Sequence, residues 1–157
     1  MIGTDAGAPA SLPPMHQSLV QDADLVAAPK RMLPQLVGWL GSRAADQQRL
    51  VSDDPIALSD ALAPLAPTLR IVVLASGDPL WFGIGRVLIE RLGSERLRFH
   101  PAPSSMQLAF ARLGRPWQES EWISLHGRDP SPLARRLQKR PASLAVLTDP
   151  GRGGVYL

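Results

Sequence analysis

The sequence contains no cysteine, which excludes disulfides, thiolate metal ligands and a cysteine nucleophile. It also has no apolar run near the roughly 20 residues that a membrane-spanning helix needs. Its first residues lack the basic segment and apolar core of a signal peptide. We therefore expect a cytoplasmic protein that makes no membrane contact.

A strong charge of one sign is absent too. The chain carries 17 basic and 14 acidic residues, a formal net charge of +3, and aromatic residues make up only 5%. The basic residues occur as scattered pairs without the interleaved aromatics that single-strand binders use. We expect no nucleic-acid partner. The histidines stand at no metal-ligand spacing, so no metal site is expected either.

What the sequence does have is an alternation of apolar runs and helical spacing in 157 residues, 45% of them hydrophobic. Strands are expected at 23–27, 70–75, 97–101, 122–125 and 143–148. Helices are expected at 13–21, 30–37 with a break at Pro34, 53–63, 82–92, 106–113 and 132–139. Repeated β-α-β order with apolar strands predicts an α/β fold, a parallel sheet with helices on both faces.

The Gly114-Arg-Pro116 segment is the expected internal boundary, because glycine ends a helix and proline prevents its resumption. It divides an N-terminal α/β domain, residues 1–114, from the incomplete start of a second α/β domain, residues 115–157. Residues 1–3 read as the clipped end of a strand, too short for a strand of their own. The chain also stops soon after its last strand, without the crossover that a further parallel strand needs. We therefore expect either a fragment or a truncated gene model.

The most informative segment is Ser-Gly-Asp-Pro at 76–79, between the strand at 70–75 and the following helix. Such a junction directs backbone N–H groups into the crevice at the carboxyl edge of a parallel sheet. Gly77 allows a ligand to approach the backbone, and Asp78 can accept hydrogen bonds from a ribose or an amino group. Plain turn chemistry is the alternative. The Lys-Ser/Thr ending of a P-loop is missing, which argues against nucleoside triphosphate hydrolysis.

Two more segments carry candidate chemistry. Ser104 and Ser105 stand at a second strand-to-helix junction, about 25 residues later, where they either grip a polar ligand or only cap a helix. His126 and Arg128 end the strand at 122–125 and suit recognition of an anion, although a structural or solvated role stays open. The two strand-to-helix junctions are expected on the same edge of one sheet.

Together these segments resemble the tetrapyrrole (corrin/porphyrin) methyltransferase family. The resemblance is nearest to the branch that methylates carbon 5 of precorrin-6Y or cobalt-precorrin-7 in cobalamin biosynthesis. It covers nearly the whole chain, in the expected order, through the following segments: Ala23-Asp-Leu-Val26, Lys30-Arg-Met-Leu33, residues 73–85, residues 103–114, Pro116-Trp117, Ser124-Leu-His-Gly-Arg128 and Leu147-Thr-Asp-Pro150.

The resemblance implies a two-domain α/β enzyme that holds S-adenosylmethionine in the cleft between its domains. Methyl transfer from a sulfonium to a ring carbon needs in-line positioning and no covalent enzyme intermediate, so no catalytic residue or general base is assigned. His126 and Arg128 become candidates for meeting a carboxylate-rich macrocycle. The residues expected at the cofactor are Ser76, Gly77, Asp78, Trp81, Ser104 and Ser105.

The resemblance also implies partners: a corrinoid tetrapyrrole as substrate, and a fused or associated module for carbon-15 methylation and decarboxylation. Whether the chain forms a homo-oligomer is left open. In the family the second domain supplies cofactor and substrate contacts, and only its start is expected here. Two alternatives therefore stay open. The chain is either a truncated, non-catalytic α/β remnant or a family member that methylates another position of the macrocycle.

Overall fold

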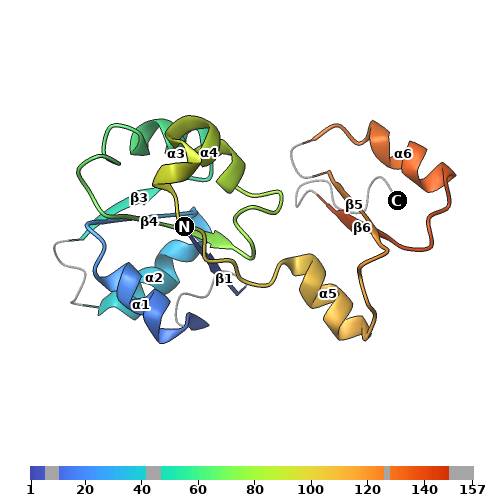
Figure 1. Cartoon of the computed structure of the whole chain (residues 1–157). Coiled ribbons are helices and arrows are strands. Elements are labelled where there is room, and N and C mark those ends of the chain that lie inside the picture. Colours follow the sequence, from blue (N-terminus) through green and yellow to red (C-terminus); the bar gives the residue numbers. More distant parts are fainter. Residues whose placement is uncertain (6–10, 42–46, 126–127, 149–157) are drawn as a thin grey trace. The chain divides into compact units, whose positions relative to one another are not determined.

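The computed structural model describes residues 1–5, 11–41, 47–125 and 128–148, shown in Figure 1. The chain falls into two compact units, Met1–Ser105 and Met106–Leu157. Each unit is described by itself. The domain boundary expected at residue 114 stays a prediction.

A parallel sheet forms the centre of the first unit. Among the described residues its strand order is β1-β4-β2-β3, and every neighbouring pair is parallel. This confirms the predicted fold class, since all four carboxyl ends meet at one edge. The strands are β1 (Ile2–Thr4), β2 (Leu25–Ala28), β3 (Gln48–Val51) and β4 (Ile71–Ser76).

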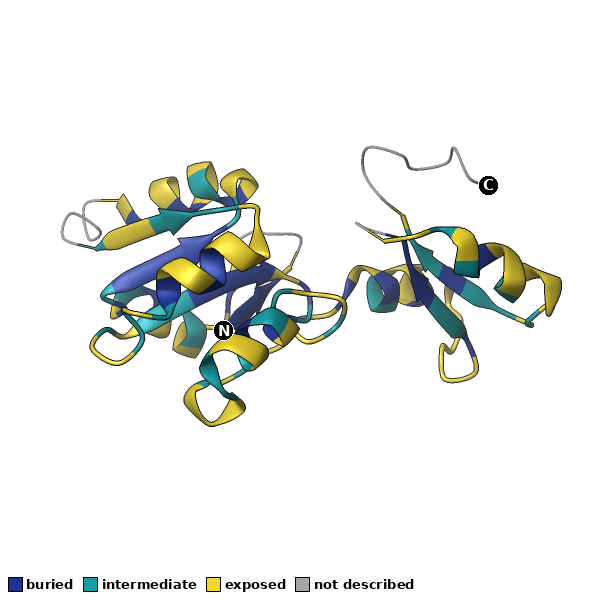
Figure 2. Ribbon diagram, turned by 90° about the horizontal axis from the view of Figure 1, so that it is seen from above, coloured by how far each residue is buried: buried dark blue, intermediate teal, exposed yellow. Residues whose placement is uncertain are grey.

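Helices cover both faces of this sheet (Figure 1). Along β2 the buried side chains alternate: Val26 and Ala28 join one apolar cluster with residues of α1 and α2, whereas Leu25 and Ala27 join another with residues of α3 and α4. Figure 2 shows buried strands between helices whose outer faces are exposed. The helices of this unit are α1 (Pro14–Gln21), η2 (Lys30–Met32), α2 (Leu33–Leu40), α3 (Pro55–Leu62), α4 (Gly85–Leu92) and η4 (Ser94–Arg96).

The second unit is smaller. It contains the parallel strands β5 (Glu121–Ser124) and β6 (Leu144–Leu147) with α6 (Ser131–Gln138) between them, and α5 (Ser105–Leu113) leads into it. Ile123, Leu125 and Leu133 form its buried core. Across all described residues, none of the helices has the length and apolar character needed to cross a membrane.

Several expected elements differ from the structure. Residues 97–101 form no regular strand, only an isolated parallel bridge between His100 and Ile2. Residues 1–3 were expected to be too short for a strand of their own, but Ile2–Thr4 form the short strand β1, which pairs with β4. Strand β3 was missed, since its polar start, Gln48-Arg49, hides the apolar pattern.

Two helix boundaries were also misplaced. Pro34 does not interrupt a helix; it stands in the first turn of α2, where its missing N–H has no intrahelical partner to lose. The helix after β4 begins at Gly85 and not near residue 82, because Phe82 has a positive φ of 51° and ends a turn. Gly83 accordingly lies before the helix.

Candidate ligand site at the carboxyl edge of the sheet

The loops that follow the strands gather at the carboxyl edge of the sheet. Strands β2 and β4 are neighbours, so residues after Ala28 and after Ser76 start from adjacent positions. Strand β1 ends beside β4, with Thr4 opposite Ser76. In open α/β sheets this edge is where ligands bind.

The Ser76–Asp78 loop is anchored through Gly77. Its N–H donates to the Thr4 carbonyl at 2.9 Å, and its carbonyl accepts from the Ala102 N–H at 3.4 Å. Gly77 has a φ of +64°, and an added Cβ would lie 3.1 Å from the Cα of Ser104. The two strand-to-helix junctions predicted from the sequence therefore touch each other, and the contact requires glycine.

Gly3 is a site residue to which the sequence analysis gave no role. A Cβ there would overlap the carbonyl oxygen of Gly77 and stand 2.6 Å from the backbone nitrogen of Ala102. The side chain of Thr4 is fully buried next to it and donates its hydroxyl to the Ala75 carbonyl at 3.0 Å. No local signal in the sequence marks this close approach, because it depends on β1 lying beside β4 in the sheet.

Asp78 organises the turn that leads into α4. Its Oδ1 accepts from the Leu80 N–H at 2.8 Å, and its carbonyl accepts from the Trp81 N–H at 3.1 Å. The Pro79 carbonyl then accepts from the Gly85 N–H at 2.9 Å. Asp78 thus has the turn role that stood as the alternative. A carboxylate offers about four acceptor sites, so one such bond is compatible with a ligand on the same group.

Two aromatic side chains, Trp81 and Phe82, follow Asp78 in the segment that leads to α4. Trp81 is half-buried and meets Phe82 edge to face, with ring centroids 4.7 Å apart at 72°. An added Cβ at Gly83 would lie 2.7 Å from the Pro79 carbonyl oxygen, so the turn around the rings is tight. Trp81 therefore lies in a tight turn close to Asp78.

Arg31 is the second residue that the sequence analysis did not assign to the site. Its Nη2 donates to the Ser76 Oγ at 2.8 Å, and both side chains are exposed. Next to it, the Lys30 N–H donates to Oδ1 of Asp53, just after β3, at 3.0 Å. Arg31 follows β2 as Ser76 follows β4, but only the strand order shows that these positions are adjacent. A guanidinium here suits a carboxylate-bearing ligand.

The remaining candidates divide between buried, exposed and undescribed positions. Ser104 is buried against Gly77, whereas Ser105 is exposed as the first residue of α5. His126 lies outside the described residues. Arg128 is exposed in the second unit, where its backbone N–H donates to the Leu125 carbonyl at 3.1 Å. In the part of the chain that the structure describes, no cluster of three or more His, Asp or Glu residues could hold a metal ion.

The fold and this edge define an α/β protein in which two loops meet at the carboxyl edge of a parallel sheet. The family model for Tetrapyrrole (Corrin/Porphyrin) Methylases matches residues 1–155, and the chain belongs to this family. Two solved structures share the fold. They are a methyltransferase, CobJ (TM-score 0.70, 22% identity, 92% of this chain and 65% of that one), and diphthine synthase (TM-score 0.68, 15% identity, 90% and 60%).

Curated relatives are more similar in sequence. A precorrin-6Y C(5,15)-methyltransferase (decarboxylating) of Sinorhizobium sp is 46% identical over 83 residues, which is 53% of this chain and 20% of that protein. A cobalt-precorrin-7 C(5)-methyltransferase of Salmonella typhimurium is 35% identical over 115 residues, 73% of this chain and 54% of that protein. The chain thus spans between a fifth and about half of the length of these relatives.

Proposed function

We propose that the chain takes part in S-adenosylmethionine-dependent methyl transfer to carbon 5 of a precorrin, precorrin-6Y or cobalt-precorrin-7, in cobalamin biosynthesis. Membership of the family and the names of the two curated relatives support the reaction class and the substrate. The single observation that carries the proposal is the contact between the Gly77 loop and the Ser104 junction at the carboxyl edge.

The proposed reaction needs no nucleophilic side chain. A methyl group moves from sulfur to carbon in one displacement, so the protein has to hold donor and acceptor within about 3–3.5 Å and in line. The N–H groups and the carboxylate of the loop suit the polar parts of the cofactor, and Trp81 suits an apolar part. In this proposal the cofactor contacts are Ser76, Gly77, Asp78, Trp81, Ser104 and Ser105, and the substrate contacts are His126 and Arg128.

The partners of the reaction belong to the proposal as well. The substrate is a corrinoid tetrapyrrole, whose carboxylates suit Arg128 and also the exposed Arg31 beside Ser76. A module for carbon-15 methylation and decarboxylation is the proposed protein partner, since one relative carries both activities in its name. We place the reaction in the cytoplasm.

Isothermal titration of the full chain with S-adenosylmethionine tests cofactor binding. Asp78→Asn separates the two roles of this residue, because an amide oxygen can still accept from Leu80 while the charge is lost. We expect Asp78→Asn to weaken binding by roughly 10- to 100-fold, the effect of one hydrogen bond to a charged group. Asp22→Asn is the matched control, because Asp22 is an exposed carboxylate that precedes β2 at the amino-terminal edge of the sheet. This variant should bind S-adenosylmethionine as wild type does.

The outcomes distinguish the alternatives. If Asp78→Asn binds S-adenosylmethionine as tightly as wild type, Asp78 only stabilises the turn and does not contact the cofactor. A folded chain that gives no heat at high ligand concentration would support the non-catalytic remnant. Incubation with precorrin-6Y and the cofactor then tests the position of methylation, and a product methylated at any carbon other than carbon 5 would support the other family activity.

A further inference from the structure

Arg31 and Ser76 form a pair of exposed polar side chains at the carboxyl edge of the sheet. Nη2 of Arg31 donates to Oγ of Ser76 at 2.8 Å. Arg31 follows β2 and Ser76 ends β4, so the bond joins two neighbouring strands at the edge where ligands bind in open α/β sheets. The hydrogen bonds that the pair can still make define the ligand that suits it.

The backbone around Arg31 is held on both sides. Before it, the Lys30 N–H donates to Oδ1 of Asp53 at 3.0 Å. After it, Met32 is only 1% exposed and belongs to the apolar cluster that includes residues of α1 and α2. Arg31 lies between these two anchors in the 3₁₀ helix η2. The guanidinium is therefore exposed on a segment whose backbone is fixed at the sheet edge.

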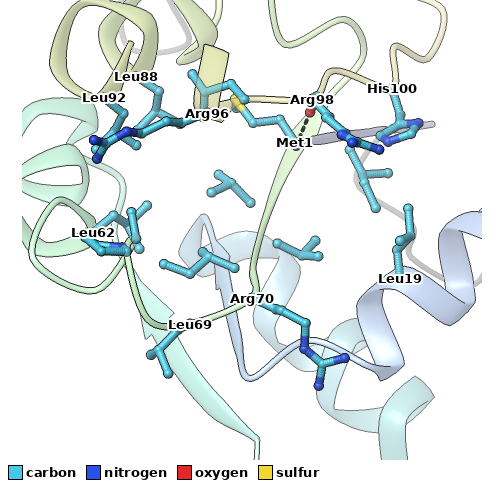
Figure 3. Close-up of a pocket in the computed structure, with 17 residues that line it drawn as sticks. Met1, Leu19, Leu62, Leu69, Arg70, Leu88, Leu92, Arg96, Arg98 and His100 are labelled. Atoms are coloured by element: carbon cyan, nitrogen blue, oxygen red, sulfur yellow. Dashed lines mark hydrogen bonds between the residues drawn. The ribbon is translucent and has the colours of Figure 1, made fainter. Parts of the chain in front are cut away.

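The partner of Arg31 is a neutral hydroxyl, whereas other arginines pair with carboxylates. Figure 3 shows two of those others, Arg70 and Arg96, at the amino-terminal edge of the sheet. Within the described ranges Arg31 takes part in no ion pair, and its guanidinium bonds to Ser76. A guanidinium without an acidic partner, at an edge that suits ligands, favours an anion. The arginines with a carboxylate at 2.8–4.0 Å are Arg70, Arg86, Arg91, Arg96 and Arg136.

The bond between the two side chains also fixes the role of the Ser76 hydroxyl. A guanidinium has N–H donors and no acceptor, so Oγ of Ser76 has to accept in this bond. The hydroxyl hydrogen then remains to be donated. Among the described residues no protein acceptor takes this hydrogen or a further N–H of the Arg31 guanidinium. The pair therefore offers a ligand only hydrogen-bond donors.

A donor-only pair with a positive charge discriminates between an acid and its amide. A carboxylate accepts at both oxygens, carries the opposite charge and matches the fork of a guanidinium. A carboxamide is neutral and accepts only at its oxygen, and its amino group would face further donors. The pair therefore suits a free carboxylate and rejects the amide.

The pair lies on the β2 side of the loop that begins at Ser76. The bond from Gly77 to Thr4 and the approach of Gly77 to Ser104 lie on the β1 side, because β4 separates β1 from β2 and the segment after His100 borders β1. A carboxylate at the pair thus leaves the contact between Gly77 and Ser104 unchanged.

We propose that Arg31 and Ser76 form a carboxylate subsite that selects the free acid of a ligand over its amide. The identity of the ligand rests on the proposed function, which supplies two sources of a carboxylate. One source is the set of side chains of the corrinoid macrocycle, and the other is the amino-acid part of the cofactor. The chemistry at the pair is the same for both sources.

Binding of matched ligands to the full chain tests the subsite and separates the two sources. Uroporphyrin, a tetrapyrrole with carboxylate side chains, and its per-amide are titrated by fluorescence. S-adenosylmethionine and its decarboxylated form are titrated by calorimetry. We expect wild type to prefer the carboxylate form in at least one of these pairs, and Arg31→Gln to reduce that preference roughly tenfold. The pair of ligands in which the preference falls identifies the source of the carboxylate.

Arg98→Gln is the matched control, because Arg98 is an exposed arginine at the amino-terminal edge of the sheet (Figure 3). This variant loses the same charge and should keep the wild-type preference. Ser76→Ala keeps the guanidinium but removes the hydroxyl that holds it, so it should lose part of the preference. Because Arg31 and Ser76 are both exposed, their variants should melt as wild type does in circular dichroism.

Equal preferences in wild type and Arg31→Gln, for both pairs of ligands, would overturn the subsite. A wild-type chain that prefers neither carboxylate form would overturn it as well. The proposed function fails or stands separately in the methylation assay with precorrin-6Y. A chain that methylates carbon 5 without the acid preference would refute the subsite alone, and a chain with the preference but no methyl transfer would refute the proposed function alone.

Discussion

Gly3→Ala should destabilise the first unit strongly. The new methyl group would overlap the Gly77 carbonyl oxygen and stand 2.6 Å from the Ala102 nitrogen, and both neighbours are backbone atoms. To remove this overlap, β1 has to move away from these loops. That movement breaks or lengthens the hydrogen bond from the Gly3 N–H to the His100 carbonyl, which is 2.7 Å long. A buried backbone group that loses its partner costs about 1–3 kcal/mol.

The bond from the Gly77 N–H to the Thr4 carbonyl, at 2.9 Å, is affected as well. With two such bonds affected, we expect a loss of about 3 kcal/mol in the free energy of unfolding. For a unit of this size that corresponds to a fall of roughly 10–20 °C in Tm. Thermal unfolding followed by circular dichroism measures it. Below the transition, S-adenosylmethionine binding should weaken as well, because the displaced atoms belong to the loops that form the candidate site.

Gly38→Ala is the matched control. Gly38 is exposed in the middle of α2, and nothing lies within 4 Å of an added Cβ. Alanine there should raise stability by about 0.5–1 kcal/mol through helix propensity. A Gly3→Ala protein that melts within a degree of wild type would refute the close packing of β1 against the Gly77 loop.

Two further predictions concern stability. The pKa of His100 is lowered, first by burial and then by the neighbouring His16, so the unfolded chain binds more protons, and stability should fall as pH drops from about 7.5 to 5. His100→Gln should flatten this dependence in urea titrations, and an unchanged slope would assign it to other groups. Asp54 caps α3 by accepting from the N–H groups of Ile56 and Ala57 at 2.8 and 3.2 Å, so Asp54→Ala should cost about 1 kcal/mol. Asp54→Ser should recover most of that loss, and equal midpoints for both variants would argue against the cap.

The candidate site could be predicted in part. The loop at 76–78 and the junction at 104–105 stood out because each interrupts an apolar pattern with glycine, serine or proline. Gly3 and Arg31 did not stand out, since nothing local marks a glycine in a short strand or an arginine after another strand. Their roles depend on β1 and β2 lying on either side of β4.

The sequence by itself determined the parallel α/β class, most helices and the family, because these depend on residue patterns within a few turns of chain. The tertiary structure decided the strand order, the contact of Gly3 with Gly77 and Ala102, and the bond from Arg31 to Ser76. Contacts between distant segments depend on how the sheet is assembled, and local propensity carries no information about that order.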